Sequence, residues 1–129
     1  MADSRDSITT TIDTYLATYS ATDREGWLEC FAEDAWIEDP VGTERREGLD
    51  AIGDFWDEAH AIPDSIELRL GDLRIIVGQE AAFTMEARPN LGGETYTLDV
   101  IDHMSFDAEG KITANRTFYD FSTMRLAHD

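Results

Sequence analysis

An aspartate on an apolar strand face is the residue of this sequence best placed to do chemistry. Residues 98–106 alternate between two faces, which predicts a β-strand. Asp102 shares its face with four apolar residues, which are Leu98, Val100, Met104 and Phe106. A buried carboxylate without partners is unfavourable, so this group must find hydrogen-bond partners or hold a proton. A neutral carboxyl group can donate a hydrogen bond, so Asp102 is a candidate catalytic donor.

Two more polar side chains fall on faces that the sequence pattern predicts to be buried. Tyr15 lies at helical spacing on one apolar face. The other residues of that face are Ile8, Ile12, Leu16 and Tyr19. Asp39 ends a short predicted strand, on the side of Ile37 and directly before Pro40. Each residue alone is also typical of a core tyrosine, a turn aspartate or a buried structural acid.

The composition predicts one globular domain over residues 1–129, long enough to bury a substantial core. The net charge of −18 argues against nucleic acid and membrane surfaces as partners. Cys30 is the only cysteine, which excludes an internal disulfide and favours a reducing compartment. The acidic start of the chain lacks the apolar stretch of a signal peptide, so we expect a cytoplasmic location.

The elements that must position these residues change character along the chain. Helical spacing predicts one helix around Tyr15, and a capping-box pattern at residues 22–25 predicts a second that buries Trp27, Leu28 and Phe31. Gly48 opens a third predicted helix. The predicted strands are Ala35–Asp39, Ser65–Val77, Ala81–Arg88, Glu94–Phe106 and Lys111–Phe121. We expect an α+β cone, with three N-terminal helices packed on a strongly curved antiparallel sheet around an apolar pocket.

Two stretches resemble the ketosteroid isomerases (steroid delta-isomerases), which have the nuclear-transport-factor-two-like fold of the SnoaL-like superfamily. Residues 31–42 include the Glu-Asp-Pro-x-Gly turn that carries the family's general base, here Asp39. Residues 98–102 match the Asp-Val-Ile-Asp strand that carries its oxyanion-hole acid, here Asp102. Tyr15 lies at the expected separation ahead of Asp39 and matches the oxyanion-hole tyrosine. The resemblance covers nearly the whole chain.

The resemblance implies a cofactor-free isomerase that moves a double bond into conjugation with a ketone. Its expected substrate is a small apolar ketone, above all a 3-oxo-steroid. The resemblance also implies a homodimer, which we expect to form through the outer sheet face. Asp39 shuttles the proton while Tyr15 and neutral Asp102 hold the oxyanion, an arrangement already established for ketosteroid isomerases. No metal site is expected, because His60, His103 and His128 lack ligand spacing.

The chain also departs from the family pattern. Phe31 and Trp56 stand where family members have tyrosines that support the catalytic tyrosine, and Tyr119 stands where a tryptophan is familiar. Asn115 and Thr117 are more polar than usual. The residues expected to bind substrate are Phe55, Trp56, Phe83, Met85, Leu98, Val100, Asn115, Thr117 and Tyr119.

Two alternatives use the same fold. A polyketide cyclase-like enzyme could apply the same acid and base to a different enolisable ketone. A noncatalytic binder of apolar small molecules is favoured by the loss of supporting tyrosines at Phe31 and Trp56. An epoxide hydrolase of this fold is disfavoured, because Val100 replaces the arginine of its Arg-x-Asp strand motif.

Overall fold

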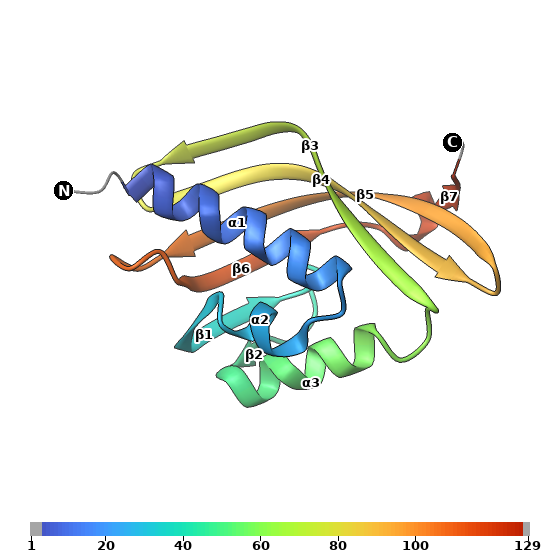
Figure 1. Ribbon diagram of the computed structural model, residues 1–129, viewed down its shortest axis with the longest axis horizontal. Helices are drawn as coiled ribbons and strands as arrows, with labels where there is room; N and C mark the ends of the chain where they lie inside the picture. The colour runs from blue at the N-terminus through green and yellow to red at the C-terminus, as the bar shows by residue number, and fades with distance from the viewer. Residues whose placement is uncertain (1–3, 128–129) are drawn as a thin grey trace.

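The computed structural model describes residues 4–127 as helices packed against one curved sheet (Figure 1). The helices are α1 (Ser4–Ser20), α2 (Arg24–Leu28) and α3 (Leu49–Ala59). The strands are β1 (Phe31–Glu38), β2 (Arg46–Glu47), β3 (Ser65–Val77), β4 (Glu80–Leu91), β5 (Glu94–Phe106), β6 (Ile112–Phe118) and β7 (Arg125–Leu126). A 3₁₀ turn, η1 (Phe121–Thr123), lies between β6 and β7.

The sheet has the strand order β2-β1-β6-β5-β4-β3, and β7 pairs with β5. The β1–β6 pair is parallel and the other pairs are antiparallel. The register shifts between Leu70 and Arg74 on β3 and between Ser105 and Phe106 on β5. Such irregularities bend a strand and increase its twist, so they help to curve the sheet over the helices.

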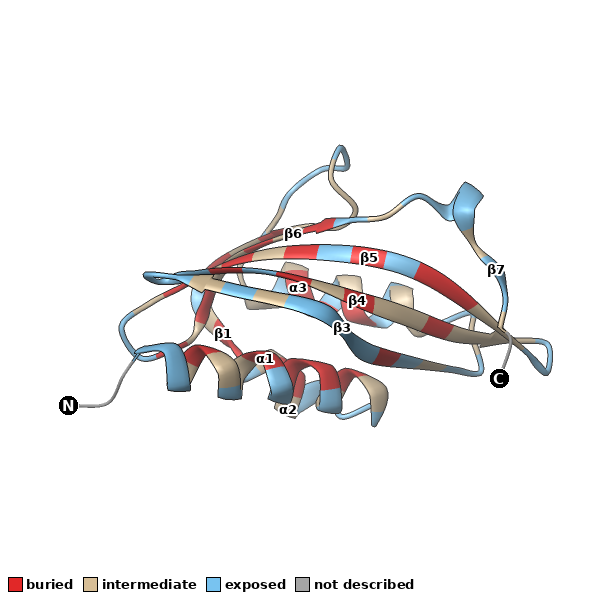
Figure 2. Cartoon of the chain, turned by 90° about the horizontal axis from the view of Figure 1, so that it is seen from above, coloured by how far each residue is buried: buried red, intermediate tan, exposed pale blue. Residues whose placement is uncertain are grey.

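The core lies between the helices and the concave side of the sheet. The α1 helix turns its buried residues toward the strands (Figure 2). These residues are Ile8, Ile12, Tyr15, Leu16 and Tyr19, as the helical spacing predicts. On β5 the buried residues alternate and include Asp102, which is fully buried. The predicted α+β cone and the predicted inner face of this strand are therefore confirmed.

Several predicted details of the local structure are wrong. Asp23, and not Thr22, caps α2, because the Asp23 carboxylate accepts a hydrogen bond from the Gly26 backbone N–H at 3.0 Å. Leu28 is only half-buried, and Phe31 is the first residue of β1, not part of the second helix. The last predicted strand stops at Phe118, and β7 follows it unpredicted. Gly48 does open α3, with a positive φ of 89° that favours glycine.

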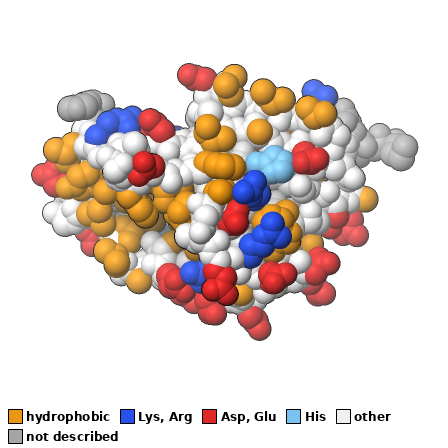
Figure 3. Space-filling model, turned by 180° about the vertical axis from the view of Figure 1, so that it is seen from behind, with side chains coloured by type: hydrophobic (Ala, Val, Ile, Leu, Met, Phe, Trp, Pro, Cys, Tyr) orange, Lys and Arg blue, Asp and Glu red, His pale blue; other side chains and the backbone are white. Residues whose placement is uncertain are grey.

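The outer face of the sheet carries exposed apolar side chains. They alternate with inward-facing residues on β3 and continue onto β5 and β6. They are Leu73, Ile75, Val77, Ile101 and Phe118. Seen from behind, hydrophobic side chains gather on the molecule, with acidic ones along its lower margin (Figure 3). Within residues 4–127, no helix has both the length and the apolar character needed to cross a membrane.

Candidate active site

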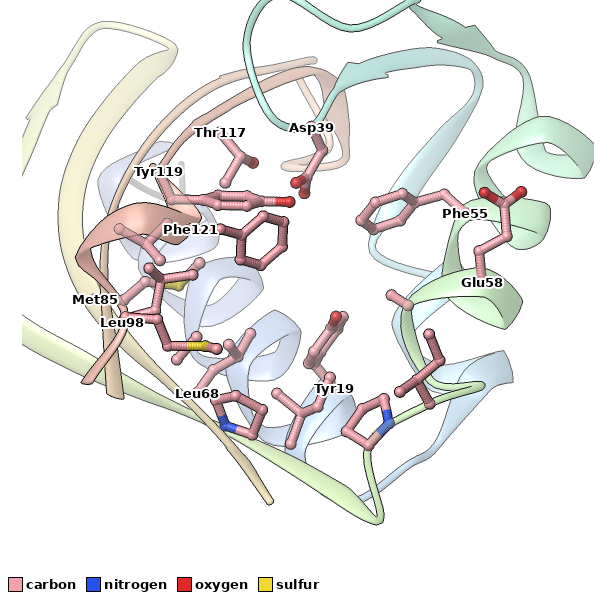
Figure 4. A pocket seen from close by; sticks show the side chains of 18 of the residues that line it. Tyr19, Asp39, Phe55, Glu58, Leu68, Met85, Leu98, Thr117, Tyr119 and Phe121 are labelled. Atoms are coloured by element: carbon pink, nitrogen blue, oxygen red, sulfur yellow. The ribbon is translucent and has the colours of Figure 1, made fainter. Parts of the chain in front are cut away.

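A cavity of about 510 Å³ opens between the helices and the inner face of the sheet. Its polar groups include Tyr15, Tyr19, Asp39, Thr117 and Tyr119, and most of the remaining wall is apolar (Figure 4). The apolar wall includes Phe55, Leu68, Met85, Leu98, Val100, Phe121 and Met124. Pockets that bind small molecules are typically this size, largely apolar, and supplied with a few convergent polar groups.

Asp39 lies immediately after β1 and lines the cavity. The peptide bond from Asp39 to Pro40 is cis, and the next residue is tied to β6 because the Val41 N–H donates to the Thr117 carbonyl at 2.8 Å. Burial raises the pKa of Asp39 to about 6, against hydrogen bonds from Tyr119 and Thr117 that lower it. Asp39 is half-buried, and its carboxyl group faces the cavity (Figure 4). A carboxylate whose pKa lies this close to neutral is suited to accepting and returning a proton.

Asp102 is fully buried and pairs across the sheet with Thr117. The Thr117 hydroxyl donates to Oδ1 of Asp102 at 2.5 Å. Burial is the main cause that raises the pKa of Asp102 to about 8; the Thr117 hydrogen bond opposes this rise, and the negative charge of Asp39 adds to it. Among residues 4–127, Oδ2 of Asp102 has no hydrogen-bond partner. A neutral acid whose second oxygen is unpaired can donate a hydrogen bond to an arriving acceptor.

Tyr15 lines the cavity, and its hydroxyl contacts Asn115 rather than a second phenol. The Asn115 Nδ2 donates to the Tyr15 hydroxyl oxygen at 3.5 Å. Burial raises the pKa of Tyr15 well above its usual value, and the charges of Asp102 and Asp39 add to this, so Tyr15 stays protonated. Phe31 packs against Tyr15 with ring centroids 6.2 Å apart and offers no hydrogen bond. Asn115 thus gives the Tyr15 hydroxyl a hydrogen bond, although the tyrosines that support it in family members are replaced here by Phe31 and Trp56.

The structure brings together some of the residues predicted for the site and not others. Six of the residues predicted to contact substrate line the cavity, and they are Phe55, Met85, Leu98, Val100, Thr117 and Tyr119. Trp56 is buried against Tyr19, Trp27 and His60 instead. Phe83 lies in the core beside Asp102, and Asn115 lies behind Tyr15. Alternation along a strand identifies the inner face, but it does not say which inner residues reach a cavity.

Three polar residues of the cavity wall are not predicted from the sequence, and they are Tyr19, Arg46 and Glu58. Tyr19 follows Tyr15 by one helical turn, so helical spacing places it on the same face but does not distinguish a cavity residue from a core residue. Arg46 donates two hydrogen bonds to the Glu58 carboxylate, at 2.9 and 2.8 Å, and this pair joins β2 to α3. Nothing in the sequence pattern pairs these two residues, because their contact depends on how β2 and α3 meet.

Residues 4–127 contain no group of three or more histidine, cysteine, aspartate or glutamate side chains placed to hold a metal ion. His103 bonds Glu80 at 2.8 Å, at an exposed position away from Asp102, and His60 bonds the Trp56 carbonyl. His128, the third histidine of the sequence, lies outside the described residues.

Comparison of the sequence with known proteins identifies both a family and a named relative. A model of the SnoaL-like domain family matches residues 12–115. A protein named Steroid Delta-isomerase, from Nocardioides simplex, is 37% identical over 89 residues, which cover 69% of this chain and 70% of the relative.

Solved structures with the same architecture are more distant in sequence. The epoxide hydrolase/cyclase-like enzyme SalBIII of salinomycin pyran-ring formation matches with a TM-score of 0.84 at 22% identity, covering 98% of this chain and all of that one. Rv0760c from Mycobacterium tuberculosis matches with a TM-score of 0.82 at 21% identity, covering 98% and 99%. A computationally designed 17-OHP binder matches with a TM-score of 0.79 at 23% identity, covering 95% and 98%. At these identities the likeness shows the fold.

Proposed function

Because the chain belongs to the SnoaL-like domain family, we propose that it is a steroid delta-isomerase that moves a β,γ double bond into conjugation with a 3-oxo group. One observation carries the proposal. The Tyr15 phenol and the Asp39 carboxyl group line an apolar cavity, and Asp102 is buried behind the cavity-lining Thr117, with pKa values of about 6 for Asp39 and about 8 for Asp102. At neutral pH this favours an ionised base beside a neutral acid.

The reaction transfers one proton within the substrate and needs no redox partner. The Asp39 carboxylate removes a proton from the carbon between the carbonyl group and the double bond, and the electron pair moves onto the carbonyl oxygen as a dienolate. Tyr15 and neutral Asp102 donate hydrogen bonds to that oxygen. Asp39 then returns the proton to the far carbon of the former double bond. Donors placed in advance stabilise the developing charge, because they need no reorganisation during the reaction.

A noncatalytic binder of apolar small molecules is the second candidate. The observation that favours it is that Asp102 does not itself line the cavity, whereas Thr117 does. Catalysis requires a substrate oxygen to come within reach of the free Oδ2 of Asp102. A binder has no such requirement.

An ultraviolet assay separates the two candidates. The purified protein is incubated with a β,γ-unsaturated 3-ketosteroid, and the absorbance of the conjugated product is followed. We expect turnover that falls about 100- to 10,000-fold in Asp39→Asn, the usual contribution of a general base. Steroid binding without turnover would favour the noncatalytic binder. If the steroid is neither bound nor converted, a different enolisable ketone is the substrate, as for a cyclase-like enzyme. Turnover that survives Asp39→Asn would overturn the mechanism.

We also infer that the chain forms a homodimer through the outer sheet face. The exposed apolar residues on β3, β5 and β6 support this, because apolar side chains gathered on one face of a sheet are often part of an interface. Sedimentation velocity of wild type, Ile101→Glu and Ile62→Glu tests it, since Ile62 is exposed but lies outside the sheet. A dimer lost only in Ile101→Glu supports the inference, and a monomeric wild type contradicts it. A cytoplasmic location stays a prediction.

A further inference from the structure

Tyr19 presents a second phenol to the cavity, and the proposed reaction does not use it. It follows Tyr15 by one turn of α1, and the two rings lie 17° from parallel with centroids 6.4 Å apart. The Tyr19 ring also packs against Trp27, Trp56 and His60, at centroid distances of 5.9, 5.2 and 4.6 Å. Packing on several sides holds the ring in one orientation. Figure 4 shows its hydroxyl pointing into the cavity.

Among residues 4–127, no hydrogen bond joins the Tyr19 hydroxyl to another residue, and Tyr19 is 8% exposed. In the protein without a ligand, water in the cavity can reach this hydroxyl. A wholly apolar ligand that filled the cavity would remove water from the hydroxyl and give it no acceptor. Leaving a buried polar group unpaired weakens binding by about 5- to 150-fold, so such a ligand is disfavoured relative to one with an oxygen at this point. A site built to bond a hydroxyl group therefore discriminates against analogues that lack it.

The surroundings also determine the role that this hydroxyl can play. Burial and the nearby charge of Asp39 both raise the pKa of Tyr19, so the group stays protonated and can donate. Along α1, residues one turn apart are separated by about 6 Å. A ligand whose carbonyl oxygen meets Tyr15 would therefore place an atom about one helical turn away opposite Tyr19. On a steroid, that atom lies in the body of the ring system and not on the carbonyl oxygen.

We propose that Tyr19 is a specificity-determining residue whose hydroxyl donates to a second oxygen of the substrate, so that the preferred substrate is an oxygenated ketosteroid. This inference rests on the proposed function, because it takes the ketone to be held at Tyr15. Tyr19 does not take part in proton transfer. It selects among ketones that Asp39 could all isomerise.

Equilibrium binding tests the inference without depending on turnover. The ligands are progesterone and three of its monohydroxylated derivatives, with the hydroxyl at carbon six, at carbon eleven or on the angular methyl group between the first two rings. Calorimetric titration gives their affinities for wild type, Tyr19→Phe and Tyr96→Phe. Tyr96 is the matched control, because it lies on β5 outside the cavity wall. Circular dichroism and the melting temperature check that each variant folds.

We expect at least one hydroxylated derivative to bind wild type about 10-fold more tightly than progesterone, the worth of one good hydrogen bond. Tyr19→Phe should remove that preference, and Tyr96→Phe should keep it. If progesterone and its derivatives lose affinity equally in Tyr19→Phe, or if wild type prefers no derivative, Tyr19 does not bind a second oxygen of the ligand. That result overturns this inference but does not contradict the proposed isomerase. If none of the steroids binds wild type, the proposed function fails and this inference fails with it.

Discussion

Thr117 donates a 2.5 Å hydrogen bond to Asp102, and it lines the cavity that Asp102 itself does not reach. Its hydroxyl also lowers the pKa of Asp39 through a side-chain hydrogen bond. A hydroxyl group has one proton and can donate it to only one acceptor at a time. When Asp102 carries its own proton, Thr117 is free to donate to the Asp39 carboxylate. One threonine thus links the protonation of the proposed base with that of the proposed acid.

Replacing Thr117 by valine tests this link. The Thr117 hydrogen bonds lower the pKa of both Asp39 and Asp102, so Thr117→Val should raise both. Both limbs of the plot of kcat/KM against pH should then move to higher pH, whereas Thr117→Ser, which keeps the hydroxyl, should leave them close to wild type. A Thr117→Val profile that coincides with wild type would show that the two acids titrate independently of this residue.

The wild-type pH profile should itself be bell-shaped. Asp39 must be ionised to accept a proton, so activity should fall as pH drops below about 6. Asp102 must be protonated to donate, so activity should fall as pH rises above about 8. These limbs belong to an interacting pair, because the charge of Asp39 raises the pKa of Asp102. The profile of Asp102→Asn should lose only the alkaline limb, and an alkaline limb that persists in that variant would assign it to another group.

Asn115 offers a test of how Tyr15 is supported. Its amide donates to the Tyr15 hydroxyl and lowers the pKa of Tyr15, so Asn115→Ala should leave a weaker hydrogen-bond donor. We expect kcat to fall about 3- to 10-fold, the size of one hydrogen bond, with a smaller change in KM. Asn90→Ala is the control, since Asn90 bonds Thr95 near the end of the β4–β5 hairpin. An equal loss of kcat in both variants would indicate a structural effect only.

The sequence predicts the strand face on which Asp102 lies, but it does not predict that Thr117 is its hydrogen-bond partner. Alternation along residues 98–106 places Asp102 on the buried face, whatever it pairs with. Its pairing with Thr117 depends on the register between β5 and β6, which includes an irregularity at Ser105 and Phe106. A shift of one residue would turn Thr117 to the other face, and no local pattern in the sequence specifies that shift.

Helical spacing gave a similar mixture of success and failure. It placed Tyr15 and Tyr19 together on the buried face of α1. It could not show that the Tyr19 hydroxyl faces a cavity, because the cavity is enclosed by strands and by α3. Asn115 shows a limit of strand alternation. Its inner-face position on β6 predicts contact with substrate, whereas in the structure it bonds the Tyr15 hydroxyl and is not among the residues that line the cavity.

The burial of Asp102 should also appear in the stability of the fold. Its pKa rises from 3.8 in the unfolded chain to about 8 in the folded protein, so between these values only the folded state holds the proton. The free energy of unfolding contributed by this group therefore decreases as pH rises through that interval, by at most about 1.4 kcal/mol per pH unit. Asp102→Asn does not titrate and should escape this loss.

Denaturant unfolding of both proteins measures the effect. The stability of Asp102→Asn relative to wild type should increase as pH rises from about 4 to about 8 and should level off above that range. A difference that is constant across this interval would mean that Asp102 titrates alike in the folded and unfolded chains. That result would leave no reason to treat it as a neutral donor.

The central claim is that Asp39 carries one proton from one carbon of the substrate to another, and isotope transfer measures this directly. A β,γ-unsaturated 3-ketosteroid is labelled with deuterium on the carbon between the carbonyl group and the double bond, and the product is analysed by mass spectrometry and NMR. We predict deuterium at the far carbon of the former double bond, with both the rate and this transfer lost in Asp39→Asn. A product that forms at the wild-type rate but carries only solvent hydrogen at that carbon would contradict the account.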